Sequence, residues 1–321
     1  MLVTPINNIC DKIRQHNNIV IAGHEFPDGD SIGSCLALAL ALNGMGKKVW
    51  AVIDDFGEKY SIIPGQELIY KGDVNELNPD LFICVDCPSA DRLGKAAMLL
   101  QKTSEVICID HHKSDDFFGK YNYVNSNVSA TCELVFHVLE RLDIMNTDIA
   151  SAIYAGIVYD TGGFLHQSTT PECLGITSKL IKQNIPFTSI YNAMLKERTL
   201  NSARMLGLAL SRLKLEDSVC YSYITQQDLI EAGASVDDLD QISNELLTTK
   251  DSAVSVFVYE KSKDFSKASF RSRTVDVREV AKSFGGGGHE RAAGANMHSS
   301  AKEALALAID KVYKAIEDYE K

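Results

Sequence analysis

The amino-acid sequence predicts an α/β protein with two domains. Its 321 residues are more than a single domain of roughly 100–200 residues requires. In the first half, short and almost continuous apolar segments alternate with helical patterns. Strands that are buried on both faces have this composition, so we expect a mainly parallel sheet flanked by helices. The second half contains strands of alternating polarity. They predict a smaller α/β domain, with a cleft between the two domains.

The period of the apolar residues gives the expected elements. In the first half, strands are expected at 18–23, 48–54, 81–86 and 105–110, and helices at 31–45, 129–142 and 147–159. In the second half, strands are expected at 219–224, 253–259 and 267–272, and helices at 276–283 and 301–319. Helices with short breaks are expected from about 171 to 214. We therefore expect one domain at 1–190, a helical connector at 191–214 and a second domain at 215–321.

Charge and cysteine content restrict the class of protein. The net charge is −11, whereas a protein that wraps long nucleic acid usually carries a basic face. The eight cysteines lie mostly in apolar runs, as expected for buried free thiols in a reducing compartment. The longest uncharged run, at 31–46, is short for a membrane span. We expect a cytoplasmic protein that binds neither a membrane nor long nucleic acid. Whether it forms a homodimer is left open.

The segment GHEFPDGDSIGS at 23–34 contains three candidate metal ligands, His24, Asp28 and Asp30. It follows the first expected strand, and ligands of open α/β sheets bind at the carboxyl ends of the strands. A proline and a glycine keep the segment out of a helix, so the three side chains can converge. Alternatively, Asp30 or Ser31 only caps the helix that follows. That interpretation accounts for one residue and not for three.

Other acidic and histidine residues also follow buried segments. Asp86 ends one expected strand, and Asp110, His111 and His112 end another. Because neutral imidazole is a common metal ligand, adjacent histidines after an aspartate favour a metal site. Asp160 ends a helical pattern, where the helix dipole disfavours a carboxylate unless a cation is near. Taken singly, Asp86 also fits a turn residue, and Asp160 also fits a solvated helix end.

Four of these carboxylates are expected to meet at one sheet edge: Asp28, Asp30, Asp86 and Asp160. Two like charges ~4 Å apart repel by ~4 kcal/mol at an effective dielectric constant of ~20, so the cluster needs cations or must take up protons. Two divalent ions would neutralise it. Oxygen and imidazole ligands favour manganese or magnesium over a structural zinc site. Such a pair of ions can activate water and stabilise a phosphoryl transition state.

The second domain contains the segment GGGGHERAAGA at 285–295. Consecutive glycines let backbone N–H groups approach a phosphate closely, and His289 and Arg291 stand beside them. Arg271 and Arg273 are two residues apart on an expected strand, so they should share one face. Arginine offers bidentate contacts to phosphate. Alternatively, the glycines form only a flexible turn.

Taken together, these motifs resemble the DHH phosphoesterase family, in the subgroup with a DHHA1 domain. The namesake motif is Asp110-His111-His112. The segments GHEFPDGDSIGS, VDCPSADRLG, SATCELVF, AGIVYDTGGF, SFRSR and GGGGHERAAGA also occur in the family's order. The layout is similar to the stand-alone oligoribonuclease (nanoRNase) and 3′-phosphoadenosine-5′-phosphate phosphatase branch. The resemblance implies two-metal hydrolysis of phosphate esters in di- to pentaribonucleotides, in that bisphosphate, or in both.

The resemblance also implies a role for each site residue. One ion would be held by His24, Asp28 and Asp86, and the second by Asp30, Asp86, His111 and Asp160. Asp110 would orient His111, and His112 would face the substrate phosphate. The expected catalytic residues are therefore Asp86, Asp110, His111 and His112. The nucleotide would be bound by Gly286, Gly287, Gly288, His289, Arg271 and Arg273, with Arg291 as a further candidate. The expected ion is Mn²⁺, with Mg²⁺ or Co²⁺ as alternatives.

Other functions remain open at this stage. A phosphodiesterase of cyclic or linear dinucleotides, such as c-di-AMP or pApA, would use the same scaffold. An inorganic pyrophosphatase would share the metal ligands, but the glycine segment and the arginines fit a nucleotide better. The non-enzyme alternative is a nucleotide-binding sensor. The intact set of candidate ligands argues against it, because clusters of perturbed carboxylates usually mark working sites.

Overall fold

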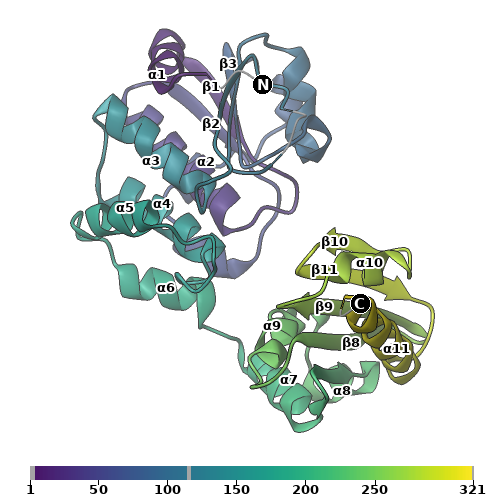
Figure 1. The fold of residues 1–321 in the computed structure, drawn as a ribbon. Helices are drawn as coiled ribbons and strands as arrows, with labels where there is room; N and C mark the ends of the chain where they lie inside the picture. Colours follow the sequence, from purple (N-terminus) through teal and green to yellow (C-terminus); the bar gives the residue numbers. More distant parts are fainter. Residues whose placement is uncertain (1–3, 114–116, 320–321) are drawn as a thin grey trace. The chain divides into compact units, whose positions relative to one another are not determined.

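The computed structural model describes residues 4–113 and 117–319 of the chain. The chain divides into two compact units, Met1–Glu197 and Arg198–Lys321 (Figure 1). Each unit is built on its own sheet, which confirms the predicted α/β class with two sheets. Within the described residues, every helix is too short or too polar to cross a lipid bilayer.

The first unit contains a parallel sheet with the strand order β2-β1-β3-β4-β5. Its strands are β1 (Asn18–Ala22), β2 (Lys48–Val52), β3 (Leu81–Val85), β4 (Val106–Asp110) and β5 (Tyr121–Val124). Alternate residues of β1 face two different cores, since Ile19 and Ile21 join one apolar cluster while Val20 and Ala22 join another. This two-sided burial explains why the strand segments are almost continuously apolar.

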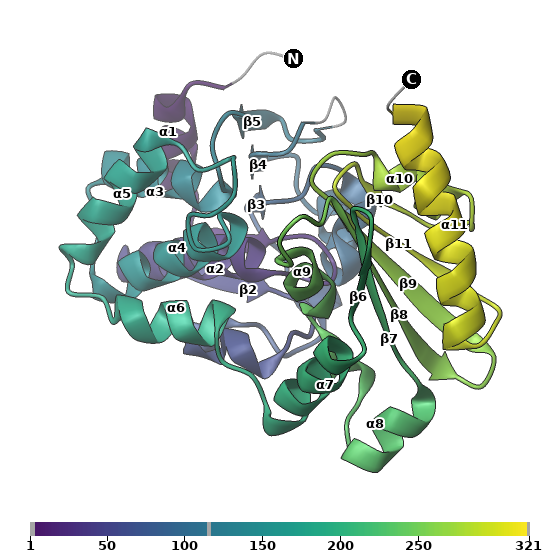
Figure 2. The same cartoon turned by 60° about the horizontal axis from the view of Figure 1, so that its bottom comes forward.

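Helices α2, α3 and α4 pack together on one face of this sheet (Figure 2). The helices of the unit are α1 (Ile6–Gln15), α2 (Gly29–Gly44), α3 (Thr131–Leu142), α4 (Thr147–Asp160), α5 (Pro171–Ile181) and α6 (Phe187–Leu195). Short 3₁₀ helices lie in the loops, at Glu58–Ile62, Gln66–Leu68, Val74–Glu76, Ala90–Arg92 and Gly94–Gln101.

Two glycines bring α2 and α4 into close contact. A Cβ atom on Gly33 of α2 would lie 2.6 Å from the carbonyl oxygen of Ala152 in α4, and one on Gly156 of α4 would lie 2.8 Å from the Oδ1 atom of Asp30 in α2. Real Cβ atoms do not approach so closely, so larger residues would push the helices apart. The close packing matters for the site because both helices carry candidate ligands.

The second unit contains a mixed sheet with the strand order β10-β11-β9-β8-β7-β6. Strands β7 and β8 run parallel, and the other neighbouring pairs run antiparallel. The strands are β6 (Lys214–Glu216), β7 (Val219–Ile224), β8 (Val254–Ser262), β9 (Phe265–Ser272), β10 (Gly287–His289) and β11 (Ala292–Met297).

Helices cover the two faces of this second sheet unequally. They are α7 (Leu200–Ser211), α8 (Gln226–Ala232), α9 (Ile242–Leu247), α10 (Val277–Lys282) and α11 (Ala301–Tyr319), with a 3₁₀ helix at Val236–Leu239. The long helix α11 runs along one face, while α7 and α9 pack on the other (Figure 2). On that other face α7 contacts β7, and α9 contacts β7, β8 and β9. Helices α1, α8 and α9 and strands β5, β6, β10 and β11 were not expected from the sequence.

Candidate metal centre and nucleotide-binding face

The predicted metal ligands lie at the carboxyl edge of the parallel sheet or at helix ends beside it. His24 follows β1, Asp86 follows β3 and His111 follows β4, while Asp30 lies in the first turn of α2 and Asp160 is the last residue of α4. Their ligand atoms form three groups, and within each group the atoms lie within 4.8 Å of one another. These groups are His24–Asp28–Asp86, Asp30–His111–Asp160 and Asp86–His111–His112.

Asp86 stands at the centre of this cluster. Its Oδ2 atom lies 3.6 Å from Nε2 of His24, and its Oδ1 atom lies 3.6 Å from Nε2 of His111. The two oxygens of one carboxylate therefore face two different histidines. Asp86 is 2% exposed and has a φ of 52°. This left-handed backbone is uncommon outside glycine, asparagine and aspartate, and it turns the chain directly after β3.

His24 is oriented as a metal ligand would be. Its Nδ1 atom lies 2.7 Å from the carbonyl oxygen of Glu25. Because a carbonyl can only accept, Nδ1 carries the hydrogen, and Nε2 is left to face Asp86 and Asp28. A second hydrogen bond that fixes the tautomer in this way is typical of metal-binding histidines. The donor set is oxygen and imidazole nitrogen, so these residues fit divalent ions such as Mn²⁺ or Mg²⁺.

Asp28 also caps α2. Its Oδ1 atom accepts hydrogen bonds from the backbone N–H groups of Asp30 and Ser31, at 3.0 and 3.1 Å. The sequence analysis considered Asp30 or Ser31 as the cap, and the structure assigns that role to Asp28 instead. One carboxylate thus stabilises the start of the helix and faces His24, with 3.9 Å between its Oδ1 atom and Nε2.

Asp30 is held by the beginning of α3. Its Oδ2 atom accepts from the backbone N–H of Thr131 at 2.6 Å, and its Oδ1 atom accepts from that of Cys132 at 2.9 Å. Helix N-termini favour negative charge because their first N–H groups lack partners within the helix. The N-terminus of α3 therefore stabilises a carboxylate that has no solvent exposure.

The sequence analysis missed Thr131. Its Oγ1 hydroxyl donates a hydrogen bond of 3.0 Å to Oδ1 of Asp86. The motif SATCELVF was noted only as part of the family resemblance, and a threonine near a helix start reads as a capping residue. The signal that could have identified it is a hydroxyl residue at a helix N-terminus that faces the sheet edge. Thr131 links α3 to the central aspartate.

Asp110 contacts a different histidine from the expected one. Its Oδ1 atom lies 2.7 Å from Nδ1 of His112 and accepts the backbone N–H of His112 at the same distance. The family resemblance implied that Asp110 orients His111, and the structure shows His112 as its partner instead. The reason is local, because a carboxylate that accepts the N–H two residues ahead brings its oxygen beside that residue's ring. His111 is placed by Asp86 and by Asp160, whose Oδ2 atom is 3.3 Å away.

Burial and like charges perturb the acids of the cluster. Burial, followed by the charges of neighbouring aspartates, raises the pKa of Asp30 and of Asp160 well above the usual range. Burial also acts to raise the pKa of Asp86, but its histidine neighbours lower it below the usual value. Burial alone would lower the pKa of His24, but hydrogen bonds to Asp86 and to the Glu25 carbonyl raise it to about 9. Without cations, protons therefore offset part of the negative charge.

In the second unit, the predicted nucleotide-binding residues fall into two groups. Arg271 lies on β9, and its Nε donates a hydrogen bond of 2.7 Å to Oδ1 of Asn244. Ala292 of β11 is paired with Arg271 on one side and with His289 of β10 on the other. Arg271 and His289 therefore share one face of the sheet. Arg273 lies beyond the end of β9 and donates to the carbonyl of Leu247. The expectation that both arginines lie on the strand is therefore wrong.

Arg291 has its own protein partners. Its guanidinium lies 2.9 Å from Oε1 of Glu290 and donates to the carbonyl of Val275. The glycine segment was expected as a loop, but Gly287–His289 form strand β10, paired with β11. Pairing with a neighbouring strand overrides the low strand propensity of glycine.

The three glycines that are expected to bind the nucleotide, Gly286, Gly287 and Gly288, have different surroundings. A Cβ atom on Gly286 would lie 2.2 Å from the carbonyl oxygen of Gly294, and one on Gly288 would lie 2.6 Å from that of Ala292. A Cβ atom on Gly287 would meet no described heavy atom within 4 Å. Gly286 and Gly288 are thus required by the hairpin itself, whereas Gly287 has open space in front of it.

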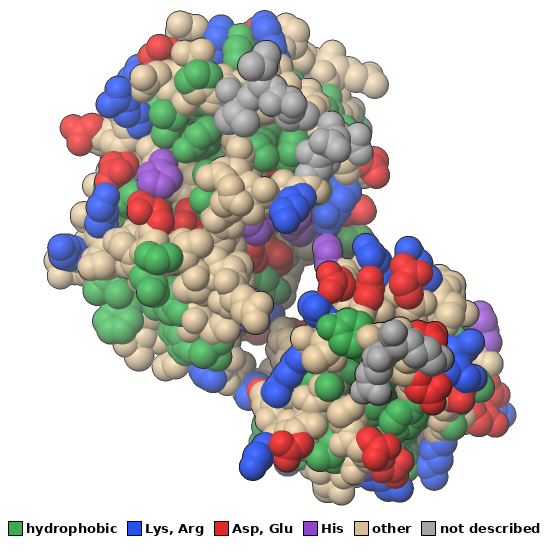
Figure 3. All heavy atoms as spheres, in the orientation of Figure 1, with side chains coloured by type: hydrophobic (Ala, Val, Ile, Leu, Met, Phe, Trp, Pro, Cys, Tyr) green, Lys and Arg blue, Asp and Glu red, His purple; other side chains and the backbone are tan. Residues whose placement is uncertain are grey.

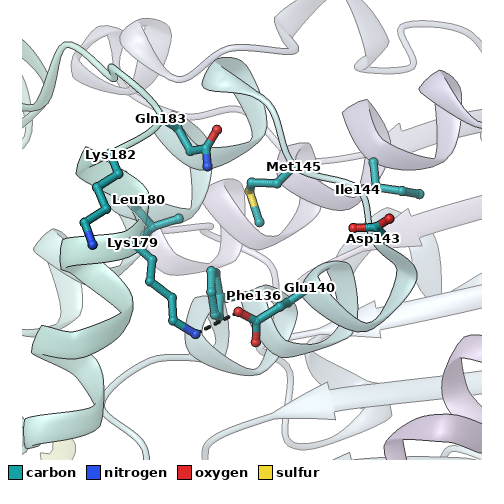
Figure 4. Close-up of a pocket in the computed structure, with 9 residues that line it drawn as sticks. All are labelled: Phe136, Glu140, Asp143, Ile144, Met145, Lys179, Leu180, Lys182 and Gln183. Atoms are coloured by element: carbon teal, nitrogen blue, oxygen red, sulfur yellow. Dashed lines mark hydrogen bonds and ion pairs between the residues drawn. The ribbon is translucent and has the colours of Figure 1, made fainter.

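A pocket between α3 and α5 lies apart from these residues (Figure 4). It is lined by Phe136, Glu140, Asp143, Ile144, Met145, Lys179, Leu180, Lys182 and Gln183, and none of them is a predicted site residue. Lys179 forms an ion pair of 2.7 Å with Glu140 inside it. Figure 3 shows charged side chains of both signs interspersed on the visible surface of each unit. Because this pocket contains no predicted site residue, we place the candidate catalytic site at the carboxylate–histidine cluster.

Metal uptake is expected to release protons. The pKa of His24 is raised to about 9, so its ring holds an extra proton near neutral pH, and a divalent ion must displace that proton. Apparent affinity for Mn²⁺ should therefore increase as the pH rises toward about 9. Calorimetric titration of metal-free protein in two buffers of different ionisation enthalpy measures the released protons. Identical heats in both buffers would contradict the expectation.

The variant Thr131→Val removes the hydroxyl that donates to Asp86 and keeps the shape of the side chain. Loss of a hydrogen bond to a ligand carboxylate is expected to weaken Mn²⁺ binding by about 10- to 100-fold, with a change in unfolding free energy of about 1 kcal/mol. The matched control is Thr177→Val, since the Thr177 hydroxyl donates to the Cys173 carbonyl within α5. Equal metal affinity in both variants would rule out the role of Thr131.

Comparisons with known proteins agree with this geometry. Residues 18–157 match the DHH family, N-terminal domain, and residues 216–318 match the DHHA1 domain. The bifunctional oligoribonuclease and PAP phosphatase NrnA of Thermus thermophilus is 30% identical over 301 residues, which cover 93% of this chain and 87% of that protein. The protein of the same name from Bacillus subtilis is 26% identical over 297 residues, which cover 89% of this chain and 91% of that protein.

A solved structure is similar over nearly the whole chain. It is an exopolyphosphatase-related protein from Bacteroides fragilis, with a TM-score of 0.90 and 25% identity, and the match covers 98% of this chain and 97% of the other. Both domains are matched in order, and a relative at 30% identity spans most of the chain. The chain therefore belongs to the DHH family of phosphoesterases, in the group that carries a DHHA1 domain.

Proposed function

We propose that this phosphoesterase hydrolyses short oligoribonucleotides of two to five nucleotides and 3′-phosphoadenosine 5′-phosphate, with divalent metal ions. The observation that carries the proposal is the position of Asp86, whose two oxygens face His24 on one side and His111 on the other. A carboxylate placed in this way suits a bridge between two cations. The names of the Thermus thermophilus and Bacillus subtilis relatives support the choice of substrates.

The first unit supplies the reacting groups. Divalent ions bound by the cluster would activate a water molecule and stabilise charge on the phosphate. Thr131 and the N-terminus of α3 fix the carboxylates of Asp86 and Asp30 before any ligand arrives. His112 is held through Nδ1 by Asp110, which leaves its Nε2 for a non-bridging phosphate oxygen. Burial alone would lower the pKa of His112, but Asp110 raises it, so the ring can carry the positive charge that stabilises the developing negative charge.

The second unit supplies the binding face. The guanidinium of Arg271 is held by Asn244 and can pair with a phosphate in the bidentate manner of arginine. His289 lies on the same face. The open space before Gly287 lets a phosphate approach backbone N–H groups. We assign a smaller part to Arg273, which lies beyond the end of β9, and to Arg291, whose positive charge is paired with Glu290.

The metal and the compartment follow from the same residues. Mn²⁺ is the proposed ion, with Mg²⁺ or Co²⁺ as alternatives, because the donor set is oxygen and imidazole. All eight cysteines are free and buried, which is typical of a reducing compartment, so we propose the cytoplasm. The net charge of −11 fits a short substrate rather than long nucleic acid.

A substrate panel tests the proposed function. Purified protein with Mn²⁺ is expected to hydrolyse di- to pentaribonucleotides and the adenosine bisphosphate faster than c-di-AMP. The variant Asp86→Asn keeps the side-chain shape, and asparagine tolerates the left-handed backbone. It should fold normally and lose at least about 100-fold in turnover, since even partners of ligands cost about 10–100-fold.

Two results of the panel would count against the proposal. Fastest turnover of the cyclic dinucleotide would favour the phosphodiesterase alternative. Binding of the bisphosphate without turnover in any metal would favour the sensor. Full activity of Asp86→Asn would remove the proposed bridging role while leaving the substrate assignment intact.

The variant Gly287→Ala tests the approach of a ligand to the glycine segment. Its Cβ atom would enter open space, so the melting temperature should not change. That atom would stand where a phosphate approaches the backbone, so affinity for the bisphosphate should fall by about tenfold. The control Gly286→Ala should instead destabilise the second unit, because its Cβ atom would collide with Gly294. Unchanged affinity of Gly287→Ala would place the ligand elsewhere.

A further inference from the structure

One face of the second sheet has a floor of small residues. Register pairs Ser269 of β9 with Gly294 of β11, and Gly294 with Gly287 of β10. Residues directly opposite each other on neighbouring strands lie on the same face. Three small residues therefore form one row across three strands. The opposite face, which contains Ala268 and Phe270, packs in the core beneath α11.

Basic side chains border this row on both sides along β9. Arg271 lies two residues after Ser269, and Lys267 lies two residues before it, so strand alternation places all three on one face. His289 stands in the row of Arg271. Arg271 and His289 were expected from the sequence to bind the nucleotide, whereas Lys267 was not.

The side chain of Lys267 leans toward Arg271. Its Cε atom lies 3.7 Å from the position that a Cβ atom of Gly294 would occupy, and Gly294 is in the next row toward Arg271. The aliphatic stem thus crosses the glycine floor. Two residues along a strand correspond to about 6.5 Å, so the ammonium group stands about one row away from the Arg271 side chain.

The electrostatic environment of Lys267 is positive. Burial lowers the pKa of Lys267, and the charges of Lys261 and Arg271 lower it further, while Asp240 acts in the opposite direction. Among the described residues, the ammonium group forms no ion pair or hydrogen bond. A half-buried cation among like charges is disfavoured on its own. An anion bound on the floor would relieve both the repulsion and the lost hydration.

We propose that Lys267 and Arg271 bind two phosphates that are one nucleoside apart, on either side of the floor formed by Ser269, Gly294 and Gly287. This inference rests on the proposed function and names the chemistry that its two substrate classes share. A 5′-phosphorylated oligoribonucleotide and a nucleoside 3′,5′-bisphosphate both present two phosphates separated by one ribose. A nucleoside monophosphate presents only one. Lys267 is therefore a residue that determines specificity for doubly phosphorylated ligands.

The test compares ligands that differ in the number of phosphates. The variant Lys267→Met keeps most of the stem and removes the charge. In EDTA, so that no hydrolysis occurs, its affinity for adenosine 3′,5′-bisphosphate and for a 5′-phosphorylated diadenylate should fall about tenfold. Its affinity for AMP should stay within twofold of the parent value. Lys267→Arg should restore binding of the bisphosphate.

A matched control removes an unrelated positive charge. Lys314 lies on α11 and pairs with Asp310 at 2.6 Å, so Lys314→Met lowers the net charge equally and should leave all three affinities unchanged. Equal weakening of AMP and bisphosphate binding by Lys267→Met would overturn the inference, and so would no weakening of either. These measurements detect binding alone, so they remain informative if the substrate panel shows no turnover. Circular dichroism of each variant separates loss of binding from loss of fold.

Discussion

The constraint on which the first unit depends is the repulsion among carboxylates gathered at one sheet edge. Asp30 has no solvent exposure and Asp86 is 2% exposed, and a pair of like charges ~4 Å apart repels by ~4 kcal/mol at an effective dielectric constant of ~20. The surrounding structure offsets this repulsion with oriented donors. They include the first N–H groups of α2 and α3, the Thr131 hydroxyl and imidazole rings. Cations would complete the balance, so metal binding and stability of this edge should be coupled.

The same constraint explains why the ligands come from distant segments. Each carboxylate needs its own donor, and a helix N-terminus offers only a few free N–H groups. Asp28 uses those of α2, and Asp30 uses those of α3. Bringing α2, α3 and α4 to one point requires close helix packing, which Gly33 and Gly156 permit. Residues that contact no ligand therefore determine whether the cluster can form.

Much of this arrangement could be predicted from the sequence, because it depends on local signals. Strands buried on both faces are apolar throughout, so a charged residue that ends one of them, such as Asp86, is conspicuous. The roles that were missed depend on three-dimensional pairing. Asp110 contacts His112 because of the turn after β4. The contact between Thr131 and Asp86 joins residues far apart in the chain. Strand β10 forms only because β11 lies beside it. The position of Lys267 beside the small residues of β11 likewise depends on how β9 and β11 pair.

The proposed substrates are polyanions, whereas the protein itself is acidic, and the second sheet offers a way to reconcile the two. With a net charge of −11, the average field repels nucleic acid, and salt screens that field beyond about 10 Å at 0.1 M. Recognition must therefore act at short range. A floor of small residues, bordered by Arg271 and Lys267, would strongly attract only a phosphate that reaches it. The proposed preference for short substrates fits this contrast between one local basic face and a net negative charge.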